Sequence, residues 1–252
     1  MRLKIRFLYL LITLIYPVLF LSCGIEEYFY LPQVNQININ RILNDTAEIT
    51  IVHPGSEFNS YFRNYAIYYK IYVSEYDNIS TIDPLGKVTE SFSAEYNNDY
   101  NAILRYADPS NLTSSTGIDQ LFLGRNYYTL NFEGKNNNSM MPPGNTLRII
   151  FPTSGEKPYA TILDGSAEEV PLMRSISDLT LINLIPDQFF FNTDELRENK
   201  GNADVARNEN AEEISIGEYT YVSMYIVSVG FNVSTITNFL SKPTFINLFK
   251  MF

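Results

Sequence analysis

Two long segments with a strand-type pattern, one in each half of the chain, constrain the fold more than any other feature of the sequence. In 63–74, one set of alternate positions holds Tyr65, Ile67, Tyr69, Ile71 and Val73, and the other holds Ala66, Tyr68, Lys70 and Tyr72. The segment 218–229 is apolar at both sets of positions and is followed by Gly230. Alternating aromatic and β-branched residues are typical of strands. The sequence therefore predicts a mainly β protein.

Shorter patterns predict the other elements. Residues 47–51 alternate as a half-buried strand, which Pro54-Gly55 ends. Gly124-Arg125 and 154–157 each lie between apolar runs and predict hairpins. Further strands are expected at 119–123, 126–133, 146–151, 158–163, 169–174 and 242–249, the last opened by Pro243.

One helix is predicted at 99–107. Its apolar residues Tyr100, Ile103, Leu104 and Ala107 recur at helical spacing, and Asn97 or Asn98 is the expected cap. The segment 176–185 fits either a strand or a helix. The segments 136–138 and 192–213 are polar and are expected to be loops, the second of them disordered.

The first residues have the pattern of an export signal. Arg2, Lys4 and Arg6 precede an apolar run over 7–21, and Ser22 stands before Cys23, the one cysteine of the chain. A basic start, an apolar run and a small residue at the cleavage point are typical of secretory signals. The apolar run is shorter than the roughly 20 residues of a membrane-spanning helix.

The segment 20–24 resembles a bacterial lipobox, although Phe20 holds a place where leucine is usual. The resemblance implies lipid transfer to the Cys23 sulfur, cleavage before Cys23 and acylation of the new amine. It also implies attachment to the bacterial cell envelope, at the outer membrane or cell surface rather than the cytoplasmic membrane. The whole chain also resembles spirochaete lipoproteins of uncharacterised role in its frequent use of asparagine and isoleucine. A signal peptide followed by a free cysteine, or an uncleaved anchor, are the alternatives.

The charge balance of the chain limits the classes of partner that it is expected to bind. Residues 1–22 hold three of the 18 basic side chains and none of the 28 acidic ones, so their removal changes the formal net charge from −10 to −13. Such a chain is not expected to bind nucleic acid, which is recognised through cations that displace counterions. Anionic lipids should repel it overall, so the expected membrane contact is the lipid on Cys23. With Cys23 acylated, no cysteine remains for a disulfide.

The outer segments resemble the two halves of a fibronectin type III or immunoglobulin-like sandwich. Residues 46–53, 63–74, 219–230 and 241–245 correspond to the strands called B, C, F and G in that family. The chain departs from the family because it has no tryptophan and because roughly 140 residues separate C from F. The expected organisation is a signal peptide (1–22), a tether (23–34), sandwich halves (35–80 and 214–252), and a β-rich insertion or second subdomain with one or two short helices (81–213).

No residue pattern predicts catalysis, a metal site or a cofactor. The only histidine, His53, lies beside Pro54 and is interpreted as structural, and no Gly-x-Ser-x-Gly motif accompanies it. A His/Cys metal cluster is excluded once Cys23 is acylated. The acidic pairs are interpreted as solvated side chains rather than as acid/base groups or calcium ligands; they are Glu168-Glu169, Asp194-Glu195 and Glu212-Glu213.

The chain has 19 tyrosines, and some of them are expected at a contact surface. Tyr127-Tyr128 and Tyr28-Phe29-Tyr30 are candidates, although tyrosine is also an ordinary strand former. The expected function is a non-enzymatic, lipid-anchored protein that presents a β-sandwich domain to a protein partner, in adhesion or in envelope assembly. The alternatives are a solute- or carbohydrate-binding lipoprotein and a carboxylate-based hydrolase.

Overall fold

The protein is described by a computed structural model. The described residues are 34, 37–41, 47–52, 62–74, 94–106, 116–135, 140, 145–152, 157–163, 168–174, 191, 204–206, 219–232 and 237–251. They all belong to one compact unit, Leu31–Phe252, and the other unit is Met1–Tyr30. Several residues discussed above therefore lie outside the described part, namely Cys23, Tyr28-Phe29-Tyr30, His53, 136–138, 176–185, Asp194-Glu195 and Glu212-Glu213.

The first sheet has six strands and is antiparallel throughout. Its order is β1-β2-β6-β7-β8-β5. The strands are β1 (Ile37–Arg41), β2 (Ala47–Val52), β5 (Asn131–Phe132), β6 (Thr146–Phe151), β7 (Tyr159–Ile162) and β8 (Val170–Met173). Residues 154–157 fall in the connection between the paired strands β6 and β7, which confirms the hairpin expected there.

The second sheet is built on the two long strands that the sequence predicted. β3 (Phe62–Ser74) pairs antiparallel with β10 (Tyr219–Asn232) along almost its whole length. β11 (Thr237–Leu240) and β12 (Thr244–Met251) both pair with β10. On the other edge of β3 lie β4 (Tyr128–Thr129), which is antiparallel, and β9 (Val205–Ala206), which is parallel.

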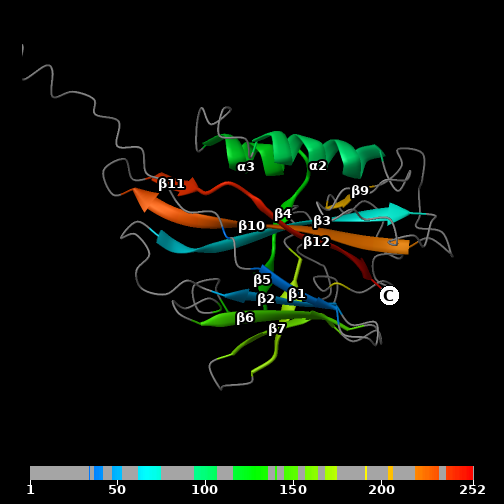
Figure 1. The fold of residues 1–252 in the computed structure, drawn as a ribbon, viewed down its shortest axis with the longest axis vertical. Helices are drawn as coiled ribbons and strands as arrows, with labels where there is room; N and C mark the ends of the chain where they lie inside the picture. The colour runs from blue at the N-terminus through cyan, green and yellow to red at the C-terminus, as the bar shows by residue number, and fades with distance from the viewer. Residues whose placement is uncertain are drawn as a thin grey trace, which may run out of the picture. The chain divides into compact units, whose positions relative to one another are not determined.

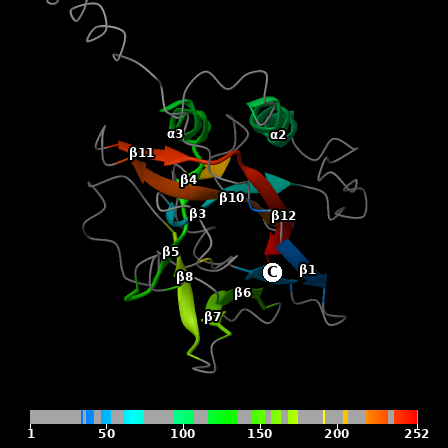
Figure 2. The same cartoon turned by 60° about the vertical axis from the view of Figure 1, so that its left-hand side comes forward.

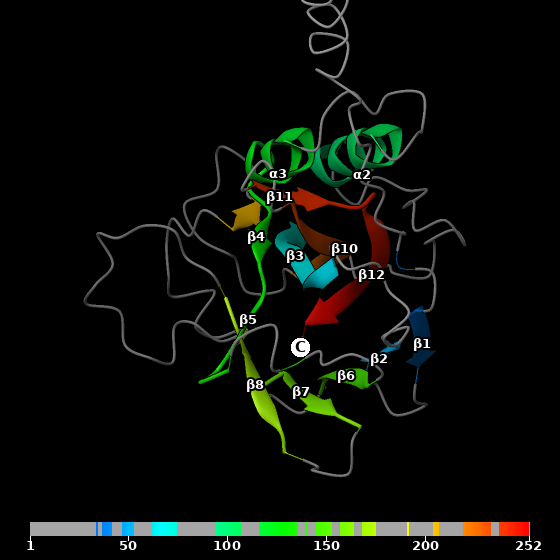
Figure 3. The same ribbon diagram turned by 90° about the vertical axis from the view of Figure 1, so that its left-hand side faces the viewer.

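The two sheets face each other, and two helices cover the far side of the second sheet (Figures 1 and 3). They are α2 (Ala94–Tyr106) and α3 (Thr116–Leu123). One core fills the space between the sheets, where Ile67 and Ile71 of β3 join Ile49 of β2 and Ile149 of β6. A second core lies beneath the helices and is rich in tyrosine. The mainly β prediction is confirmed, and β3 is covered on both faces.

The helix expected at 99–107 is present but begins earlier, at Ala94. Asn97 and Asn98 therefore lie inside α2, and their prediction as capping residues is wrong. The apolar spacing did locate the buried side of the helix, because Tyr100 and Ile103 are buried. The helix extends further towards its N-terminus, where Tyr96, four residues before Tyr100, also packs onto the sheet with its ring centre 5.3 Å from that of Tyr72.

The strand predicted at 119–123 is wrong, because these residues form most of α3. A short apolar run is compatible with either structure, and tertiary contacts decide it. Ile118 and Phe122, four positions apart, are both buried, and the Phe122 ring stacks on Tyr68 at 4.2 Å. Gly124 does not form a hairpin but follows the helix, and its N–H donates to the Gln120 carbonyl.

The single strand predicted at 126–133 is divided between the two sheets. β4 pairs with β3 in the second sheet, and β5 pairs with β8 in the first. Between them, the buried Leu130 donates its N–H to the Ile67 carbonyl. This segment therefore crosses from one sheet to the other (Figure 2).

Two further predictions need correction. The segment 192–213 is not a polar loop throughout, because Asp204 is buried and β9 pairs with β3. The strand predicted to end before Gly230 continues to Asn232. Its register with β3 shifts at Val229/Gly230, and its pairing with β11 runs without a break from Val229 to Asn232. A shift of this kind lets a strand bend without ending.

The expected neighbours of the long strands are present, because β3, β10 and β12 pair in that order. Strands β6, β7 and β8, from the range 81–213, complete the sheet that β1 and β2 begin. The particular immunoglobulin or fibronectin type III fold remains a prediction. No helix among the described residues is long and apolar enough to cross a membrane.

Candidate functional site

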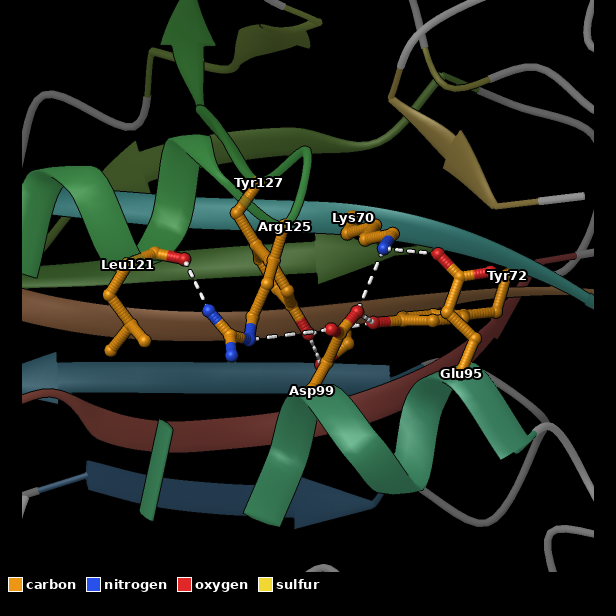
Figure 4. A network of polar contacts seen from close by, with 8 residues as sticks. Lys70, Tyr72, Glu95, Asp99, Leu121, Arg125 and Tyr127 are labelled. Carbon is orange, nitrogen blue, oxygen red and sulfur yellow. Dashed lines mark hydrogen bonds and ion pairs between the residues drawn. The ribbon is translucent and has the colours of Figure 1, made fainter. Parts of the chain in front are cut away.

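A dense group of polar side chains lies between the helices and the second sheet in the described part of the chain (Figure 4). At its centre is Lys70 of β3, whose side chain is only 2% exposed. Its Nζ is 2.6 Å from Glu95 Oε1 and 2.8 Å from Asp99 Oδ2. We call this group, with Tyr72, Arg125, Tyr127 and Ser223, the Lys70 cluster.

The strand and helix periods explain how the cluster assembles. Alternation along β3 places Lys70 on the same face as Tyr68 and Tyr72, beneath the helices. Glu95 and Asp99 are four residues apart on α2, so both carboxylates project from one side of the helix. Lys70 can therefore bridge two successive turns of α2 and fix the position of the helix along β3.

Tyrosine hydroxyls extend the cluster across the sheet. The Tyr72 hydroxyl donates to Asp99 Oδ2 at 2.8 Å and lies 3.0 Å from the Tyr127 hydroxyl. Tyr127 in turn donates to Ser223 Oγ of β10 at 3.3 Å. The Lys70 ammonium also lies 5.2 Å from the Tyr72 ring centre and 5.8 Å from that of Tyr127, which are favourable cation–π distances.

Arg125 joins the cluster to α3. Its Nε is 3.6 Å from Asp99 Oδ1, and its Nη1 donates to the Leu121 carbonyl at 3.4 Å. The cluster then contains two cations, Lys70 and Arg125, and two carboxylates, Glu95 and Asp99, so its charges balance. Glu95 and Arg125 are partly exposed, whereas Lys70 and Asp99 are buried. These contacts connect both helices to the sheet, and the ammonium group of Lys70 is buried among them.

Burial makes the phenols of the cluster harder to ionise. Desolvation is the main cause that raises the pKa of Tyr72 and of Tyr127 above the ordinary value of 10.0. The neighbouring charge of Asp99 raises both pKa values further, since it disfavours a second negative charge. Tyr225, in the same core, has a raised pKa for the same first reason.

These shifts predict a loss of stability in alkali. The unfolded chain releases its tyrosine protons near pH 10, whereas the folded chain retains them, so stability is fully present below pH 10 and falls above it. Each buried tyrosine should contribute a slope of about 1.4 kcal/mol per pH unit. Urea unfolding between pH 8 and 11 measures the effect. Tyr72→Phe should reduce the slope, and an unfolding free energy that is constant to pH 11 would contradict the prediction.

A second buried ion pair joins the two sheets. Arg174, directly after β8, donates from Nε to Asp204 Oδ2 at 2.7 Å and from Nη2 to Asp204 Oδ1. Tyr69 of β3 also donates to Asp204 Oδ2, at 2.9 Å, and the Asp204 carbonyl accepts the Ile71 N–H. Burial lowers the pKa of Arg174, but the hydrogen bonds and charge of Asp204 outweigh it and raise that pKa overall.

The residues proposed from sequence as possible acid/base groups or contact residues do not form a site in the described part. Glu168 and Glu169 are exposed, and Glu168 pairs with Lys135 at 3.0 Å. Tyr127 is fully buried, so it is not part of a contact surface, while Tyr128 is partly buried in β4. Within the described ranges, no group of His, Cys, Asp and Glu is arranged to hold a metal ion.

Sequence reasoning did not identify the two ion-pair groups. A lysine in an otherwise apolar and aromatic strand face was the available signal for Lys70. Glu95 and Asp99 at helical spacing were the matching signal, but the helix was predicted to begin too late to include Glu95. Asp204 and Arg174 carried no signal, since Asp204 lies in a polar segment that was predicted to be a loop and Arg174 is the last residue of a predicted strand.

Comparison with known proteins gives no relative. No family model matches the chain, and neither the curated proteins nor the solved structures contain a significant match.

Proposed function

We propose that this chain is a non-enzymatic lipoprotein of the bacterial cell envelope that presents a β-sandwich-based domain to a protein partner. The observation that carries the proposal is the leader, in which a basic start and an apolar run end at Ser22-Cys23. Lipid on Cys23 would fix the protein to a membrane, since two or three acyl chains anchor a protein stably. The outer membrane or the cell surface is the proposed location.

The buried polar groups support a presenting role over catalysis. Catalytic groups must reach a substrate, and the central pair of the Lys70 cluster, Lys70 and Asp99, is instead buried between helix and sheet. Glu95 and Asp99 are two carboxylates brought together by the fold, but Lys70 bridges them. The charges of the cluster are therefore used to hold the domain in one conformation.

The anchor is tested by mass spectrometry of the protein from its native membrane. We expect a chain that begins at Cys23 and carries lipid, and a Cys23→Ala variant that keeps its leader and has no lipid. Native protein with an intact leader, or with an unmodified thiol, would contradict the anchor.

The presenting role is tested by brief protease treatment of intact cells. Cleavage of this protein, with a cytoplasmic protein left intact, would place the domain at the surface and support adhesion. Protection in intact cells and cleavage after lysis would favour envelope assembly. Turnover of sugar, peptide or phosphate substrates by the purified protein would contradict a non-enzymatic role.

A further inference from the structure

We propose that one corner of the domain rests on the lipid bilayer that holds Cys23. This corner is formed by Phe62 and Arg63 at the start of β3, Phe231 near the end of β10, Leu240 at the end of β11, and Lys242 just after it. We call it the β10–β11 corner. The inference rests on the proposed lipid attachment, and it goes further by assigning an interaction surface and its partner.

The first argument is where the tether joins the fold. Val34 is buried in the core between the sheets, and its carbonyl accepts a hydrogen bond from Thr244 Oγ1 at 2.8 Å. The packed domain therefore begins no later than Val34. Thr244 is the first residue of β12 and pairs with Ile226 of β10. Four residues further along β10 is Gly230, about 13 Å from Ile226 along the strand, so the corner lies on the same part of the domain as the attachment point.

The second argument is the length of the tether. Only residues 24–33 separate Cys23 from Val34, and they span at most about 38 Å when fully extended. A globule the size of Leu31–Phe252 is about 44 Å across. The tether is too short to reach around the domain, so the side opposite Val34 cannot lie on the membrane. The surfaces within reach of the membrane lie around the side that holds Val34, and the corner is one of them.

The third argument is the charge of the corner. Residues 228–245 contain Lys242 and no acidic residue, and 62–64 contain Arg63 and no acidic residue. Both segments therefore carry positive charge, in a mature chain whose net charge is −13. Although anionic lipids repel the chain as a whole, each basic side chain near such a surface is attracted to it, and the attraction acts within about 10 Å at 0.1 M salt.

The fourth argument is the mixture of side chains. Arg63 is exposed, and its guanidinium carbon lies 5.9 Å from the centre of the Phe231 ring. Phe62, Phe231, Leu240 and Lys242 are each partly exposed. Aromatic and long basic side chains together suit the boundary between lipid headgroups and acyl chains. The corner thus has the composition that a bilayer interface accepts.

The opposite side of the domain provides a reference point. Strand β8 is separated from β1 by three strands of the first sheet, and Val34 precedes β1. In the ribbon views, β11 lies beside the helices, and β7 and β8 lie on the other side of the domain (Figures 2 and 3). Glu169, exposed just before β8, should therefore be far from the bilayer.

Energy transfer from the domain to the membrane tests the proposal. The natively lipidated protein is placed in vesicles that contain anionic phosphatidylglycerol and a lipid-bound acceptor dye. A donor dye is attached to a cysteine introduced by Asn64→Cys, near the corner, or by Glu169→Cys. We expect transfer from position 64 to be at least about twice that from position 169, because the acceptor lies in the membrane.

Charge reversal separates docking from a purely passive tether. Arg63→Glu with Lys242→Glu should lower transfer from position 64 in anionic vesicles, as should uncharged vesicles or high salt. The matched control reverses two lysines on the other side, Lys135→Glu with Lys157→Glu, and should leave transfer from position 64 unchanged. Circular dichroism of each variant confirms that it is folded.

The contrary outcomes are distinct. Equal transfer from the two positions, or no response to the Arg63 and Lys242 reversal, would overturn the corner as a membrane contact. Transfer that depends on protein density rather than on lipid charge would instead make the corner a contact between copies of the chain, and would also overturn it.

The mass of the same preparation reports lipid on Cys23. A preparation from native membranes without lipid contradicts the proposed function as well, whereas a lipidated preparation with equal transfer contradicts the corner alone.

Discussion

Replacing Arg174 by alanine is expected to lower the free energy of unfolding by about 3–5 kcal/mol. The Arg174 guanidinium is completely buried and binds both carboxylate oxygens of Asp204. Without it, Asp204 would be a buried charge whose one remaining side-chain donor among the described residues is the Tyr69 hydroxyl. A loss of this size is a large part of the 5–15 kcal/mol that stabilises a typical domain. Urea unfolding at pH 7 measures it.

A double replacement tests whether the cost comes from the unpaired charge. Arg174→Met with Asp204→Leu removes both charges and keeps apolar volume between the sheets, so it should be much less harmful than either single change. Arg148→Ala is the matched control, because Arg148 is 34% exposed and its partner Glu48 is 11% exposed, so water can reach this pair in part and the change should cost clearly less than Arg174→Ala. Similar losses for Arg174→Ala and Arg148→Ala would contradict the buried pairing.

Replacing Lys70 by methionine should cost about 3 kcal/mol, because Asp99 loses its buried cationic partner. Methionine has a similar length, so the change tests the charge rather than the packing. The effect should be concentrated at α2, since Lys70 is bonded to two carboxylates of that helix. Hydrogen exchange should therefore accelerate in α2 more than in β3 or β10.

The carboxylates of α2 supply the controls. Asp99→Asn combined with Lys70→Met removes both buried charges and should restore part of the loss. Glu95→Gln should cost about 1 kcal/mol or less, since the Glu95 side chain is 43% exposed and water screens its pairing with Lys70. An unchanged exchange rate in α2 of the Lys70→Met variant would mean that the ion pairs do not hold the helix.

The alternating patterns predicted the long strands because a strand covered on one or both faces must repeat every two residues. This placed β2, β3, β6, β10 and β12 closely, and it correctly grouped Tyr69 with Ile67 and Ile71. It did not identify what would cover the other face of β3. Apolar and aromatic residues on that face are compatible with a second sheet, with helices or with a partner.

The short segments were misassigned for a related reason. The residues 119–123 are apolar enough for a strand, and only the packing of Phe122 onto Tyr68 requires a helix. The segment 126–133 reads as one strand, yet β4 and β5 within it pair with different sheets. Local pattern carries no information about which distant strand will provide the hydrogen bonds.

The sequence alone determined the mainly β class, the two central strands, the acidic balance and the proposed attachment through Cys23, because each depends on residue types and local period. Only the tertiary structure decided the pairing of Lys70 with Glu95 and Asp99, and of Arg174 with Asp204. These partners are 25 to 30 residues apart along the chain. The physical reason is that a buried charge needs an opposite charge within a few ångströms, and folding, rather than spacing along the chain, brings the two together.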